Sequence, residues 1–106
     1  MIVWMTSDLE ELFVSGKSKV YKDVERIREL YDGFTRAIYI FSMSSNTEEL
    51  KKYSYLHYEK LKYQFSGYSS VRLSNRYVHR LLFTESEDGI EIRLIDIDKT
   101  HYGNKT

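Results

Sequence analysis

The sequence contains no cysteine. This absence excludes disulfide bonds, zinc–thiolate sites and a thiol nucleophile, and it is compatible with a reducing cytoplasm. No apolar run approaches the roughly 18 residues that cross a bilayer. The opening apolar segment, residues 1–5, is short and has no basic residues before it, unlike a signal peptide. The sequence therefore predicts a cytoplasmic protein without a membrane partner.

Glycine is scarce, with five residues, and proline is absent. The glycines form neither a phosphate-binding loop nor a dinucleotide-binding fingerprint. The histidines and carboxylates form no H-x-E or H-E-x-x-H motif and no acidic cluster, which are common signals of metal sites. We therefore expect no nucleotide cofactor and no metal. The absence of proline by itself indicates no function.

Charge is balanced over the 106 residues but unevenly distributed. Residues 51–80 contain seven lysines and arginines and one carboxylate, Glu59, for a net charge of +6, whereas residues 1–50 have a net charge of −3. Local fields, rather than total charge, govern the binding of polyanions. The basic segment fits a nucleic-acid-binding surface, and it fits equally well the solvated face of a sheet.

The first part of the chain predicts a strand followed by a helix. Residues 2–5 are apolar and read as a short strand. Ser7 and Glu10 have the spacing of a capping box, in which each side chain accepts a hydrogen bond from the backbone amide of the other residue. We therefore expect a helix to begin near Asp8 and to stop at Gly16.

Two further helices and a short one are predicted before the sheet. Asn46 can cap a short helix over residues 47–53. Residues 34–41 show apolar side chains at helical spacing and predict a helix of their own. The same spacing upstream predicts a helix that ends at Gly33, and its apolar positions are Val20, Val24, Ile27 and Tyr31.

After the helices, the apolar period changes to two, which is typical of strands. Residues 68–73 alternate, so Arg72 is expected to face away from the apolar side of its strand. Residues 78–84 read as a second strand, and Asp88-Gly89 predicts a tight hairpin leading into a partner strand over 90–97. The pattern predicts an α+β fold, with N-terminal helices packed on a mainly antiparallel sheet.

Glu59 and Arg80 are the leading candidates for chemistry. A carboxylate can take the proton from an RNA 2′-hydroxyl, and cations can stabilise the charge that develops on the phosphate. Arg80 lies between apolar strand residues, so it must find an anion or reach solvent. The alternative is a structural ion pair of Glu59 with Lys62 or with an arginine. Arg72 and Arg76 have weaker individual claims, and Arg76 is expected in the turn between strands.

Histidines supply the candidate acid. His101 follows a strand and could protonate a leaving oxygen, while Tyr102 beside it could stack on a base or orient the phosphate. The alternative for this pair is a frayed chain end. His57 and His79 are ambiguous.

The order of these motifs resembles the RelE/ParE superfamily of bacterial toxin–antitoxin toxins, and most of all its YoeB and HigB branches. Four segments carry the resemblance: Glu59-Lys60-Leu61-Lys62, Ser66-Gly67-Tyr68-Ser69-Ser70-Val71-Arg72-Leu73, His79-Arg80-Leu81-Leu82-Phe83 and His101-Tyr102. The resemblance implies one domain over residues 1–106 with a RelE-like, microbial-ribonuclease-like fold of four to five strands. The segment between Arg72 and His79 is longer than in the YoeB pattern, which predicts a longer turn.

The resemblance also implies an activity: a ribosome-dependent mRNA endoribonuclease (mRNA interferase) that needs no metal or other cofactor. Glu59 would be the general base, Arg80 would stabilise the transition-state phosphate, His101 would be the general acid, and Tyr102 would position the substrate. The residues that would contact RNA are Lys60, Lys62, Arg72 and Arg76. The implied partners are a cognate antitoxin and mRNA in the 16S rRNA decoding region, and the resemblance allows a homodimer.

The sequence leaves two other functions open. A ParE-type toxin would inhibit DNA gyrase without catalysis, but such chains usually lack the terminal His-Tyr pair and the base-like glutamate. An RNA-binding module without catalysis could use the cations together with Tyr63 and Tyr68 as stacking surfaces.

Overall fold

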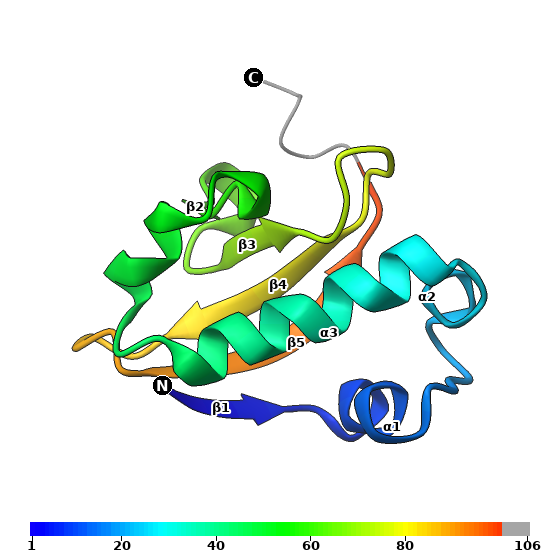
Figure 1. Cartoon of the computed structure of the whole chain (residues 1–106). Helices are drawn as coiled ribbons and strands as arrows, with labels where there is room; N and C mark the ends of the chain where they lie inside the picture. Colours follow the sequence, from blue (N-terminus) through cyan, green and yellow to red (C-terminus); the bar gives the residue numbers. More distant parts are fainter. Residues whose placement is uncertain (101–106) are drawn as a thin grey trace.

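In the computed structural model, which describes residues 1–100, helices lie over one face of a five-stranded sheet (Figure 1). The strands lie in the order β1 (Ile2–Met5), β5 (Glu91–Asp98), β4 (Arg80–Glu85), β3 (Ser69–Arg72) and β2 (Glu59–Lys60). β1 runs parallel to β5, and every other neighbouring pair is antiparallel. The predicted α+β class and mainly antiparallel sheet are confirmed.

The first helix, α1, spans Ser7–Ser15. Its N-cap is Thr6, whose hydroxyl accepts a hydrogen bond from the Leu9 amide at 3.3 Å. The predicted cap at Ser7 was wrong by one residue, because Thr6, whose hydroxyl can also cap a helix, takes that place and leaves Ser7 inside the first turn. The helix ends at Gly16 as predicted, in the left-handed conformation with a φ of 74°.

The predicted helix end at Gly33 was wrong. A short helix, α2 (Lys22–Arg26), stops at Ile27, and α3 (Arg28–Met43) then runs without a break through Gly33. Glycine is present there because α3 lies directly against the end of β3. A Cβ atom on Gly33 would lie 1.9 Å from the carbonyl oxygen of Leu73. The glycine therefore permits close packing and does not terminate the helix.

Short 3-10 helices connect α3 to the sheet. The predicted cap at Asn46 is confirmed, since its side chain accepts a hydrogen bond from the Glu49 amide at 3.2 Å. The segment that follows, η1 (Thr47–Lys52), is a 3-10 helix and lies where the short helix was predicted. Two more such helices follow, η2 (Ser54–Leu56) and η3 (Tyr63–Phe65).

Two loops join the last three strands. Residues 73–79 form the long connection between β3 and β4 that the sequence predicted, and Arg76 lies within it. The hairpin between β4 and β5 turns at Gly89, which has a φ of 73° and whose amide binds the Ser86 carbonyl at 3.0 Å. The Asp88-Gly89 turn is therefore confirmed.

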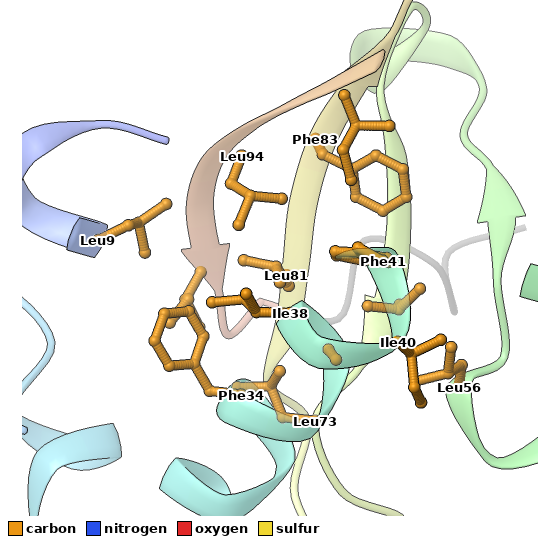
Figure 2. Packing of buried hydrophobic residues seen from close by; sticks show 14 of the residues in the cluster. Leu9, Phe34, Ile38, Ile40, Phe41, Leu56, Leu73, Leu81, Phe83 and Leu94 are labelled. Atoms are coloured by element: carbon orange, nitrogen blue, oxygen red, sulfur yellow. The ribbon is translucent and has the colours of Figure 1, made fainter. Parts of the chain in front are cut away.

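The hydrophobic core lies between α3 and the sheet (Figure 2). Phe34, Ile38 and Phe41 of α3 pack toward the β4 residues Leu81 and Phe83. No helix within residues 1–100 is both long and apolar enough to cross a membrane.

Strand alternation places a second set of side chains on the side of the sheet away from α3, here called the far face. In β4 the core residues are Leu81 and Phe83, and in β3 the core residue is Val71. The residues between them therefore point the other way. Together with the residue of β2 paired to them, the set that defines the far face is Glu59, Ser70, Arg72, Arg80 and Leu82.

Candidate functional site

The structure brings Glu59 and Arg80 together on the far face. Arg80 Nη1 lies 3.4 Å from Glu59 Oε1. The Glu59 side chain is 48% exposed and that of Arg80 is 13% exposed, so the pair lies at the surface with the guanidinium largely covered. The sequence singled out both residues, and the sheet register explains why they meet.

The ion pair passes over β3. Glu59 is paired with Ser70 across β2 and β3, and Ser70 is paired in turn with Leu82 of β4. Arg80 lies two residues before Leu82 on the same face. Because neighbouring strands are about 4.8 Å apart, β2 and β4 are separated by about 10 Å, which a long side chain such as arginine can span. Arg80 therefore reaches diagonally across β3 to Glu59.

Arg72 is directed to the loop between β3 and β4. Its Nη2 donates to the Tyr77 carbonyl at 3.0 Å and its Nε donates to the Ser74 carbonyl at 3.3 Å. These bonds fix the start of β4, and so the position of Arg80 on the far face. Arg72 thus has a structural role in the loop, and its contact with RNA stays a prediction.

Arg76 is not brought to the Glu59–Arg80 pair. Its Nη1 lies 3.3 Å from Glu29 Oε1 of α3, on the helical side of the molecule. Glu29 also accepts a hydrogen bond from the Ser74 hydroxyl, so the carboxylate holds the loop by two contacts. The sequence could not show this, because Glu29 is far from Arg76 along the chain.

The two predicted lysines lie on the surface near β2. Lys60 follows Glu59 and therefore points to the other side of the strand. There it lines a cleft of about 480 Å³ together with Glu85 and Glu87. Lys62 is exposed and precedes η3. The cations of the basic segment, residues 51–80, are thus divided between the two faces of the sheet, and they do not form one basic surface.

A polar cluster on the helical side escaped the sequence analysis. Glu85 Oε2 accepts hydrogen bonds from the Tyr58 hydroxyl at 2.5 Å and from Ser69 Oγ at 2.6 Å. Burial, followed by this hydrogen bond to Glu85, raises the pKa of the Tyr58 phenol well above its ordinary value. Strand alternation could have indicated this cluster, because Glu85 lies two residues after the core residue Phe83 and therefore points to the same side of the sheet.

His79 also lies on the helical side. Its side chain is 9% exposed, and Nε2 is 3.4 Å from Asp23 Oδ2. Lys99 Nζ binds the same Asp23 oxygen at 2.9 Å. The hydrogen bonds from Lys99 and then His79 lower the pKa of the Asp23 carboxyl. His79 therefore belongs to a structural cluster with α2, and His57 is exposed in the left-handed region with a φ of 49°.

Two predicted catalytic residues, His101 and Tyr102, lie outside the described residues. Their roles as general acid and as substrate-positioning residue stay predictions. Among residues 1–100, no group of three or more histidines and carboxylates is arranged to hold a metal ion.

No family model and no curated protein sequence matches the chain. Solved structures do match it. A YoeB/ParE toxin from Agrobacterium tumefaciens is 16% identical, covers 94% of this chain and 99% of its own, and has a TM-score of 0.54. The YoeB dimer from Staphylococcus aureus is 18% identical, covers 96% of this chain and 98% of its own, and has a TM-score of 0.51. The chain therefore has the fold of these toxins over nearly its whole length.

Proposed function

We propose that this chain, which has the fold of YoeB toxins, is the toxin of a type II toxin–antitoxin system and cleaves mRNA on the ribosome. The observation that carries the proposal is the Glu59–Arg80 contact of 3.4 Å on the far face. The resemblance assigns a base and a phosphate-binding cation to these two positions, and their closeness supports the proposal that both act on one phosphodiester.

The reaction needs only protein groups. Glu59 takes the proton of a ribose 2′-hydroxyl, and the 2′-oxygen then attacks the adjacent phosphorus. Arg80 stabilises the negative charge that builds on the phosphate oxygens. The bond from phosphorus to the 5′-oxygen breaks, and His101 is proposed to give that oxygen its proton. The products are a 2′,3′-cyclic phosphate and a 5′-hydroxyl.

The contact between Glu59 and Arg80 describes the enzyme before RNA binds. A phosphate offers Arg80 two oxygens that match its planar fork, which makes it a strong competitor for the guanidinium. When Arg80 turns to the phosphate, the Glu59 carboxylate becomes available to the 2′-hydroxyl. Because Glu59 is half exposed, its carboxylate can be solvated when it leaves the pair, and the phosphate replaces it as the anion beside the largely covered Arg80.

The proposed partners of the chain are an antitoxin, RNA and a second copy of the chain. A cognate antitoxin would cover the far face or displace the end of the chain, and the protein would act in the cytoplasm. The Staphylococcus aureus YoeB structure is described as a dimer, which supports a test for self-association of this chain. Lys60, Lys62, Arg72 and Arg76 are proposed as RNA contacts, and three of them, Lys60, Lys62 and Arg76, are exposed.

The test compares three assays of the purified chain: cleavage of mRNA on ribosomes, cleavage of free mRNA, and inhibition of DNA gyrase. We expect primer extension to reveal new 5′ ends in mRNA on translating ribosomes, far fewer in the same mRNA without ribosomes, and no change in DNA gyrase supercoiling. Expression without an antitoxin should arrest growth. Gyrase inhibition without RNA cleavage would instead support the ParE-type function. Binding of RNA without either activity would support a non-catalytic module.

A further inference from the structure

Ser70 lies under the proposed active site. It is the residue of β3 directly opposite Glu59, it points to the far face, and it is 0% exposed. The Arg80–Glu59 contact passes above it from β4 to β2. Its hydroxyl has no hydrogen-bond partner within residues 1–100. Ser70 is thus a small polar side chain at the floor of the site.

Two features of Ser70 need an explanation, its small size and its hydroxyl. The size is explained because a side chain much larger than serine would obstruct the path of Arg80 to Glu59. The hydroxyl is not explained in this way, because alanine would be small enough as well. A buried hydroxyl that makes no hydrogen bond destabilises the folded protein, so alanine would be the better residue for packing alone.

We propose that Ser70 is a positioning residue for Glu59, an inference that rests on the proposed ribonuclease function. When the RNA phosphate draws Arg80 away, the Ser70 hydroxyl donates a hydrogen bond to one oxygen of the Glu59 carboxylate. Side chains directly opposite each other on antiparallel strands have Cβ atoms about 5 Å apart, so a hydroxyl and a carboxylate can meet with a change of rotamer. The other carboxylate oxygen then faces the 2′-hydroxyl.

The two adjacent serines of β3 make a matched comparison. Ser69 faces the helical side, where its hydroxyl binds Glu85 at 2.6 Å. Ser69→Ala removes a hydrogen bond that the folded protein makes before RNA binds, and should lower the urea midpoint without changing kcat. Ser70→Ala removes a hydroxyl that forms its bond only during the reaction. It should leave the urea midpoint unchanged or raise it, while kcat falls.

The experiment measures kcat and KM for cleavage of ribosome-bound mRNA, together with urea unfolding, for the wild type and both alanine variants. We expect Ser70→Ala to lower kcat by about 10- to 100-fold, as for the loss of one hydrogen bond to a charged group, with KM unchanged. Ser70→Thr keeps the hydroxyl and should recover part of that loss.

Several results would overturn the inference. They are a wild-type kcat in Ser70→Ala, a loss confined to KM, or a loss of kcat matched by a lower urea midpoint. The wild type and Glu59→Gln are measured in the same assay. If the wild type does not cleave RNA, the proposed function itself fails. If the wild type cleaves, Glu59→Gln does not, and Ser70→Ala cleaves normally, only the role of Ser70 is refuted.

Discussion

Replacing Glu59 by glutamine separates a catalytic base from a structural ion pair. Glutamine has nearly the same shape and can still accept a hydrogen bond from Arg80, but it cannot take a proton. Because the Glu59 side chain is 48% exposed, the 3.4 Å contact is screened by water. Its loss should cost about 1 kcal/mol of unfolding free energy, the upper end for exposed pairs, because the Arg80 side chain is only 13% exposed. Loss of a general base should slow cleavage about 10²–10⁴-fold, equal to about 3–5 kcal/mol in the activation barrier.

The predicted kinetic effect therefore exceeds the stability effect about threefold or more, and the two can be measured on the same preparation. Urea unfolding gives the first quantity, and single-turnover cleavage of mRNA on ribosomes gives the second. Asp32→Asn is the control on α3, since Asp32 contacts Arg28 at 3.2 Å with a side chain that is 59% exposed. It should lower the unfolding free energy by no more than about 1 kcal/mol with unchanged cleavage. If Glu59→Gln cleaves like the wild type while its stability falls, the contact is structural and the proposed mechanism is wrong.

Three further substitutions test the fold and its electrostatics. Gly33→Ala should destabilise the protein by more than the usual 0.5–3 kcal/mol of a point mutant, because its Cβ would lie 1.9 Å from the Leu73 carbonyl oxygen; a melting temperature equal to that of the wild type would contradict this packing. Thr6→Ala should cost about 0.5–2 kcal/mol by removing the N-cap of α1, measured by urea unfolding. Tyr58 has a raised pKa in the folded state, so its contribution to stability is complete below about pH 10 and is lost as the pH rises beyond that value. Melting temperatures from pH 8 to 11 should therefore fall less steeply for Tyr58→Phe than for the wild type, and equal slopes would refute the assignment.

Local patterns in the sequence were enough to predict most elements. The alternation in residues 68–73 placed Arg72 on the face away from the core, and Asp88-Gly89 gave the hairpin. Asn46 and Gly16 marked a helix start and a helix end correctly. These signals depend on neighbouring residues alone, which is why they could be read without a structure.

The errors came from contacts between distant parts of the chain. A glycine in a helical pattern predicts an end, but Gly33 is needed because Leu73 packs against α3. Thr6, the observed N-cap, and Ser7, the predicted one, are chemically alike, and only the three-dimensional entry of the chain into α1 selects between them. Local patterns therefore predicted the type of each element better than its exact boundary.

At the candidate site, too, the sequence identified residues but could not predict their contacts. Chemistry singled out Glu59 and Arg80, but their contact depends on the register of three strands, which the sequence does not specify. The partner of Arg76 could not be predicted, since Glu29 lies on another element. Ser70 was read only as part of a motif, because nothing in the sequence shows that its side chain is buried beneath an ion pair.

The chemical ends of the RNA fragments test the central claim most directly, because attack by the 2′-oxygen determines them. After cleavage of ribosome-bound mRNA by the wild-type chain, we expect downstream fragments with a 5′-hydroxyl, which polynucleotide kinase labels without prior phosphatase treatment. Upstream fragments should end in a 2′,3′-cyclic phosphate or the 3′-phosphate formed from it. Fragments with a 5′-phosphate and a 3′-hydroxyl would show that water attacks the phosphorus, and would contradict a mechanism in which Glu59 activates the 2′-hydroxyl.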